Sequence, residues 1–295
     1  VVPFLILGGL GLLWAFAEWE ERQERLGRDS LLKLPLLRIP SMRAGLSSLF
    51  MQQVVLLGTF FVLPVFLQVV LGLDAFETGV RLIPMSVAML VAALLGPGLA
   101  ARQSPKRVAQ VGLVALAIGA AILVGTIDYE LVRIEFSIGL AIFGTGAGLL
   151  ASQLGNVIMS SVNPSDTNEA GGLQGTAQNL GSSFGTALMG AILLSGLAGA
   201  FVERVATNPA LPPELRATIS EAVAAGGLEV VPADQLEAAA LDAGLSPEEA
   251  SAVTADYADA QLEGLQNALG AVAIFATLGL WFARRLPAKP FETAD

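Results

Sequence analysis

Residues 171–190 read GGLQGTAQNLGSSFGTALMG, and their pattern decides the fold class. Gln174 and Gln178 are four residues apart, so they share one side of a helix. Gly181 and Gly185 have the same spacing, and glycines four apart let two membrane helices approach closely. The stretch therefore predicts a membrane helix in which a glycine packing seam runs beside a polar wall.

Polar side chains continue along this predicted helix. Ser182 extends the line of glutamines, and Asn179 begins a second line with Ser183 and Thr186. Two interpretations stay open for these groups. The amides either bond neighbouring helices, or they line a solvated path for a substrate.

Apolar runs of similar length lie on both sides of this helix. A membrane helix needs about 20 mostly apolar residues, and backbone groups in lipid must be bonded within their own segment. The composition agrees, because hydrophobic residues make up 54% of the chain and charged residues 14%, whereas soluble domains are about 25% charged. We therefore expect an all-α, polytopic membrane helix bundle. Its seven predicted spans are 3–17, 44–71, 78–101, 108–127, 136–162, 171–200 and 265–283.

The first predicted span is short and begins close to Val1, without a basic region typical of a signal peptide. We therefore expect that sequence precedes this chain in the whole protein.

Cysteine and histidine are both absent from the sequence. Membrane enzymes and metal sites usually need these residues or clustered carboxylates near the membrane surface. We therefore expect no enzyme activity, no metal, no cofactor and no nucleic-acid partner.

Basic residues gather on one side if the predicted spans alternate. Twelve of the 16 Lys and Arg residues then lie on that side, including Arg102, Lys106 and Arg107. Basic loops mark the cytoplasmic side, so the C-terminus is expected in the cytoplasm and the protein in the plasma membrane. The other basic residues of this side are Arg22, Arg25, Arg28, Lys33, Arg38, Arg43, Arg284, Arg285 and Lys289.

This arrangement divides the chain into four parts. Residues 1–43 hold the end of a linker helix and a basic loop, and residues 44–200 a five-helix bundle. Residues 201–264 form an acidic extracytoplasmic loop with short helices, and 265–295 the last span and the tail.

The acidic loop carries a net charge of −10, which equals that of the whole chain. It is either a solvated cap or a vestibule that attracts cations. A sensor domain would need an apolar core of its own, and the scarcity of aromatic residues argues against one.

The other spans carry fewer polar residues. In 136–162, Gly144 and Gly148 predict helix packing, whereas Gln153 and Asn156 are candidates for the substrate path. In 44–71, Gln52 and Gln53 are weaker candidates. The central stretches contain no ionisable residue, so a proton-carrying carboxylate is expected outside these spans.

Two segments resemble a known family. Residues 63–102 (LPVFLQVVLGLDAFETGVRLIPMSVAMLVAALLGPGLAAR) and 169–197 (EAGGLQGTAQNLGSSFGTALMGAILLSGL) are similar to the later helices of the major facilitator superfamily, in its fourteen-helix drug:proton antiporter branch. The resemblance implies that this chain is half of such a fold, with helices eight to fourteen.

The resemblance also implies a function. It indicates proton-coupled export of small amphipathic or apolar compounds, such as drugs, by alternating access, with the missing N-terminal half as a partner. The turn GPGLAARQSPKR (96–107) is similar to the superfamily's cytoplasmic signature, and Arg102, Lys106 and Arg107 match its basic positions. Ala101 replaces the acidic residue of the signature. The alternatives are a metabolite carrier of the same fold and a non-transporting membrane sensor or interaction protein.

Overall fold

The computed structural model describes residues 2–25 and 34–286, although several side chains of the first helix are outside this description. Helices joined by short connections make up the described chain. Three of them are short, namely η1 (Leu34–Arg38), η2 (Val65–Val70) and η3 (Pro164–Asp166). The α-helices are α1 (Val2–Arg25), α2 (Pro40–Pro64), α3 (Ala75–Arg102), α4 (Pro105–Gly125), α5 (Arg133–Met159), α6 (Thr167–Thr207), α7 (Pro213–Gly226), α8 (Ala233–Asp242) and α9 (Pro247–Ala283).

Six helices in the described ranges are long and apolar enough to cross a membrane. They are α2 with η2, α3, α4, α5, α6 with η3, and α9, and they confirm the all-α membrane bundle. The first of the seven predicted spans lies within α1, which is not among these six. Arg28, Lys33 and Lys289, which we assigned to the basic side, lie outside the described residues.

Local sequence signals explain where the spans begin and end. Asp74 caps α3, because its Oδ1 accepts a hydrogen bond of 2.7 Å from the Glu77 amide and the Glu77 carboxylate accepts one from the Asp74 amide. Ser104 caps α4, whose first residue is Pro105. Pro64 ends α2, and the chain continues through the π-helical turn η2.

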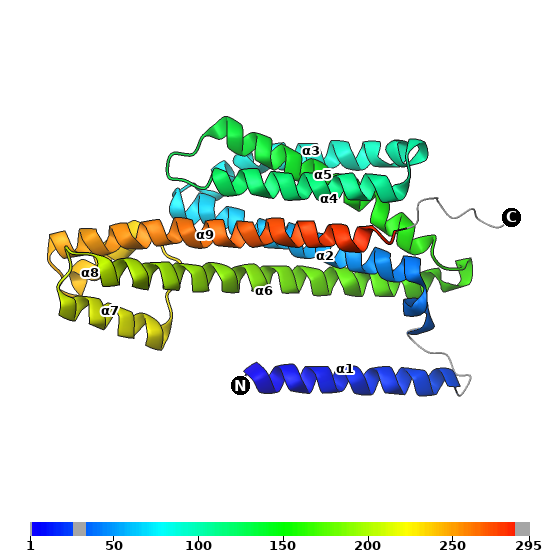
Figure 1. Cartoon of the computed structure of the whole chain (residues 1–295), viewed down its shortest axis with the longest axis horizontal. Helices are drawn as coiled ribbons and strands as arrows, with labels where there is room; N and C mark the ends of the chain where they lie inside the picture. Colours follow the sequence, from blue (N-terminus) through cyan, green and yellow to red (C-terminus); the bar gives the residue numbers. More distant parts are fainter. Residues whose placement is uncertain (1, 26–33, 287–295) are drawn as a thin grey trace.

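The six membrane-length helices pack as two interlocked groups. In chain order they form the triplets α2–α3–α4 and α5–α6–α9. The first helix of each triplet packs on the other two helices of the opposite triplet, so α5 contacts α3 and α4, and α2 contacts α6 and α9 (Figure 1). The two packed groups are therefore α3, α4 and α5 on one side and α2, α6 and α9 on the other. Contacts of α9 with α4 and of α2 with α5 join them. Neither triplet is therefore a separate domain.

Glycines make close helix contacts, and these include the four positions that the sequence indicated. A Cβ on Gly181 would lie 2.7 Å from the carbonyl oxygen of Phe50, and one on Gly185 would lie 2.5 Å from that of Val54. Gly144 and Gly148 approach the backbone of α3 even more closely. The backbones of α6 and α5 thus rest directly on α2 and α3.

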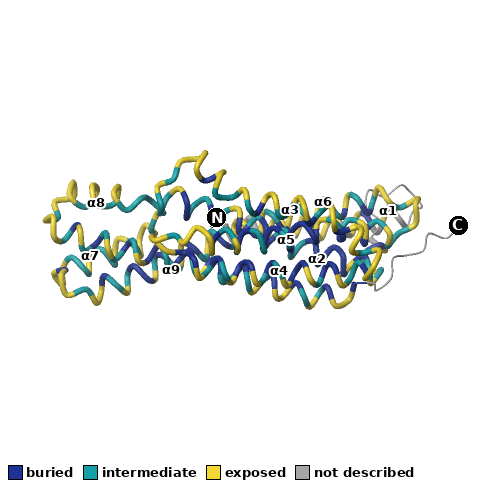
Figure 2. Tube along the Cα trace, turned by 90° about the horizontal axis from the view of Figure 1, so that it is seen from above, coloured by how far each residue is buried: buried dark blue, intermediate teal, exposed yellow. Residues whose placement is uncertain are grey.

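Helices α6 and α9 extend beyond the other spans and, together with α7 and α8, build a cap at one end of the bundle (Figure 1). Contrary to the sequence-based expectation, this cap has an apolar core, which includes Phe201 and Tyr257 with their rings 5.7 Å apart and perpendicular. The expectation failed because α6 and α9 stay paired after leaving the membrane layer. Their apolar sides remain in contact, and partly buried leucines and valines of α7 and α8 cover them. Figure 2 shows that the cap is otherwise more exposed than the bundle.

Candidate substrate path

The open side of α6 carries the polar residues that the sequence singled out. Asn179, Ser183 and Thr186 are exposed, whereas Gln174, Gln178 and Ser182 are half-buried. The hydroxyls of Ser182 and Thr186 donate to backbone carbonyls four residues earlier. Both hydroxyls are therefore hydrogen-bonded within α6 and cost little free energy on this surface. Because the glycine seam of α6 faces α2, the polar residues occupy the neighbouring side, where Asn179, Ser183 and Thr186 form the open surface.

Two of the predicted amides are instead buried between helices. Gln52 is 3% exposed, and its Nε2 lies 3.4 Å from the carbonyl oxygen of Ala147 on α5. Gln153 is 1% exposed and donates to the Ser152 hydroxyl at 3.0 Å. The Gln52 amide therefore reaches from α2 to α5, whereas the Gln153 bond stays within α5, and neither side chain lines an open path in this conformation.

The remaining two candidates differ from each other. Gln53 is half-buried, and its Cβ lies 2.9 Å from the position of a Cβ on Gly181, so it belongs to the contact of α2 with α6. Asn156 is exposed near the end of α5.

Three buried polar atoms in the membrane-spanning parts of α2 and α6 have no hydrogen-bond partner in the described part of the protein. They are the hydroxyl of Ser48 and the side-chain carbonyl oxygens of Gln52 and Gln174. An unsatisfied buried polar group costs about 1–3 kcal/mol. Ser48 is one turn before Gln52 on α2, and the sequence analysis missed it because a single serine in an apolar helix gives no distinctive signal.

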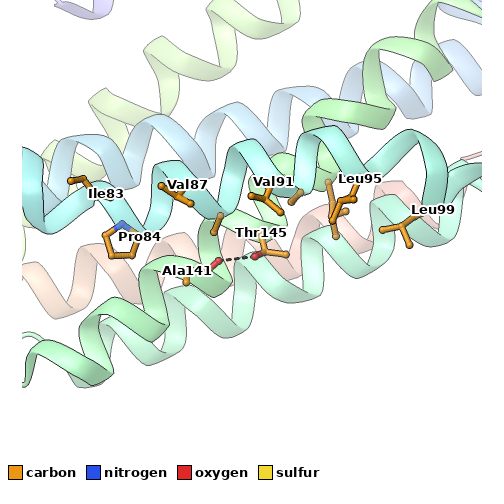
Figure 3. A pocket seen from close by; sticks show the side chains of 11 residues that line it. Ile83, Pro84, Val87, Val91, Leu95, Leu99, Ala141 and Thr145 are labelled. Atoms are coloured by element: carbon orange, nitrogen blue, oxygen red, sulfur yellow. Dashed lines mark hydrogen bonds between the residues drawn. The ribbon is translucent and has the colours of Figure 1, made fainter.

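A groove of about 610 Å³ runs between α3 and α5 (Figure 3). Its wall on α3 is a stripe of apolar residues four apart. Thr145 contributes its one hydroxyl, which donates to the carbonyl oxygen of Ala141 at 2.8 Å. The labelled residues of the stripe are Ile83, Val87, Val91, Leu95 and Leu99. The spacing was visible in the sequence, but no periodic pattern reveals which partner helix forms the second wall.

The basic turn between α3 and α4 lies at the end of the bundle opposite the cap (Figure 1). Lys106 donates a hydrogen bond from Nζ to the carbonyl oxygen of Arg284, which brings the turn against the end of α9. Within the described ranges, neither Arg102 nor Arg107 forms an ion pair shorter than 4.0 Å. This agrees with Ala101 at the position where the family signature has an acid.

The geometry thus combines an apolar groove with a separate amide-bearing surface. No amide that the sequence proposed for the substrate path lines this groove. The arrangement suits contact with apolar or amphipathic molecules, because both surfaces lack charged side chains along their membrane-spanning parts.

Comparisons with known proteins identify the family of this chain. The model of the Major Facilitator Superfamily matches residues 1–186. The chain is 30% identical over 198 residues to a protein named probable actinorhodin transporter from Streptomyces coelicolor, covering 66% of this chain and 34% of that protein. It is 29% identical over 205 residues to the drug efflux pump JefA of Mycobacterium tuberculosis, covering 70% and 39%.

A solved structure shows the same fold. The fucose:proton symporter of E. coli aligns with a TM-score of 0.53 and 17% identity, covering 82% of this chain and 48% of that one. The chain spans between about a third and a half of the lengths of these relatives.

The bundle of membrane-length helices defines a multi-pass membrane protein. The chain belongs to the major facilitator superfamily.

Proposed function

We propose that this chain is the later part of a secondary transporter that exports small amphipathic or apolar compounds by alternating access. The observation that carries the proposal is the exposed amide of Asn179 on α6, a membrane-length helix without central charges. A polar surface at membrane depth is costly against lipid, so it fits a wet path. The names of two relatives, probable actinorhodin transporter and drug efflux pump JefA, support export as the direction.

Proton coupling is part of the proposal. The charged residues of α3 and α6 lie toward the helix ends, as Glu77, Arg81 and Glu169 do, whereas those of α9 lie in its first half, up to Glu263. A proton carrier would be a carboxylate within the membrane, and the part of the transporter that precedes this chain would supply it. The same proposal puts the basic end and the C-terminus on the cytoplasmic side of the plasma membrane.

A reconstitution experiment tests the proposal. We expect vesicles that contain the transporter extended by its preceding half to accumulate the dye ethidium when their lumen is more acidic than the outside. They should release protons as the dye enters. Vesicles with residues 1–295 alone should show neither. Dye uptake without proton movement would refute proton coupling. Coupled uptake by the isolated chain would refute the proposal that it is a dependent half.

A second candidate, a sensor or interaction role for the cap, is favoured by one observation. The cap has an apolar core, which such a role requires. Replacing residues 209–245 by a short Gly/Ser linker separates the candidates. Export that continues unchanged supports transport alone, whereas loss of export with the bundle still folded supports a role for the cap.

A further inference from the structure

A second groove, of about 410 Å³, lies between α2, α6 and the end of α9. Its walls are apolar for most of its length, with Phe50 on α2, Leu180 on α6 and Phe282 on α9. Leu180 remains 58% exposed, so the described protein leaves this surface open.

Arg43 is the charged residue among those that line the groove, and it stands at one end. It belongs to the first turn of α2, which begins at Pro40, so it lies where the helix enters the membrane. Within the part of the chain that the structure describes, its guanidinium has no hydrogen bond and no ion pair shorter than 4.0 Å. The groove thus has an unpaired cation at its mouth.

The apolar part continues inward from this cation. From Arg43 to Phe50, α2 rises about 10 Å at 1.5 Å per residue, and α6 rises as far from Leu173 to Leu180. A groove of this kind begins in the head-group layer and ends within the hydrocarbon layer. Its occupant must therefore be anionic at the surface and apolar below it.

We propose that this groove binds an anionic phospholipid of the adjoining leaflet, with the phosphate against Arg43 and one acyl chain along Phe50 and Leu180. Basic pockets between membrane helices recognise anionic head groups, and the guanidinium matches phosphate in both charge and geometry. An apolar helix in the groove would leave Arg43 unpaired, and a soluble anion would leave the apolar walls uncovered. The inference does not depend on the transported substrate.

A fluorescence experiment tests this site on the transporter extended by its preceding half, in lipid nanodiscs. Leu180→Trp places a reporter in the groove, and its signal is the difference from the parent chain, which contains Trp residues of its own. The nanodiscs contain a small fraction of lipid brominated on the acyl chain near the head group. This probe is phosphatidylglycerol in one series and phosphatidylcholine in the other.

We expect brominated phosphatidylglycerol to quench the reporter at roughly one fifth of the concentration that phosphatidylcholine requires, since one basic residue near an anionic surface supplies about that factor. Arg43→Gln should abolish the difference. The matched control Arg133→Gln removes an exposed arginine at the opposite end of the bundle and should leave the preference intact.

Three results would overturn the proposal. The first is equal quenching by both lipids, and the second is a preference that survives Arg43→Gln. The third is an absence of quenching by either lipid, because protein then covers the groove, and cross-linking through Cys at position 180 would show whether a second copy does so. Native mass spectrometry supplies an independent measurement, in which retention of phosphatidylglycerol must fall in Arg43→Gln.

Discussion

The carbonyl oxygen of Met85 on α3 occupies the space in which a side chain on Gly144 of α5 would begin. One turn further on, the carbonyl oxygen of Met89 is placed in the same way against Gly148. The contact is between two backbones, so no flexible side chain can move aside. The relative position of α3 and α5, and with it the groove of Figure 3, depends on these glycines.

Gly144→Ala should therefore destabilise the bundle. An added methyl group would force α3 away from α5, and overpacking of this kind costs about 1–3 kcal/mol. We expect a lower apparent melting temperature in detergent. Gly199→Ala on α6 is the matched control, because a Cβ there meets no atom within 4 Å and alanine favours the helix. Equal melting temperatures for both variants would show that the helices can separate without cost.

The buried amide of Gln52 gives a prediction of opposite sign. Its carbonyl oxygen has no partner, and its Nε2 contact is long at 3.4 Å, so Gln52→Met should leave stability unchanged or raise it. The control is Gln266→Met. Gln266 donates to the carbonyl oxygen of Ile127 at 3.1 Å, and loss of this bond should lower the melting temperature. A strong loss of stability in Gln52→Met would mean that the amide is well satisfied in the membrane.

Tyr257 holds the connection between α7 and α8 onto the cap core. Its hydroxyl donates to the carbonyl oxygen of Glu229 at 2.7 Å and accepts from the amide of Val231 at 2.9 Å. Tyr257→Phe leaves both backbone groups without this partner, at a cost of about 1–3 kcal/mol. We expect faster amide hydrogen exchange at residues 228–232, measured by mass spectrometry. Tyr129→Phe is the comparison, since Tyr129 is 42% exposed, and unchanged exchange in Tyr257→Phe would contradict the role of the hydroxyl.

Much of the fold follows from local features of the sequence. The ranges of apolar residues predicted where the membrane helices lie, and the structure adds capping boxes at Asp74 and Ser246, where α3 and α9 begin. The four-residue spacing of glycines predicted helix contacts at Gly181 and Gly185. These features are local because backbone hydrogen bonds in lipid must form within each helix.

The candidate site was less predictable. Periodicity assigns a residue to a side of its own helix, but it does not identify the helix that covers that side. The sequence therefore treated Gln153 and Asn179 alike, although the structure buries the first against its neighbours and exposes the second. The cap core was missed for the same reason, because it depends on two helices that lie far apart in the sequence.

The exposed amide of Asn179 tests the substrate path directly. In the transporter extended by its preceding half, Asn179→Leu should lower the rate of dye export by roughly 2- to 10-fold, which corresponds to the loss of one hydrogen bond of about 0.5–1.5 kcal/mol. Stability should change little, since the side chain is exposed. The matched control is Thr277→Val on α9, where an exposed hydroxyl bonds back to the carbonyl oxygen of Ala273. Equal export by both variants would indicate that the polar surface of α6 meets another helix, and in that case a cysteine at position 179 would be protected from water-soluble maleimides in every conformation of the transporter.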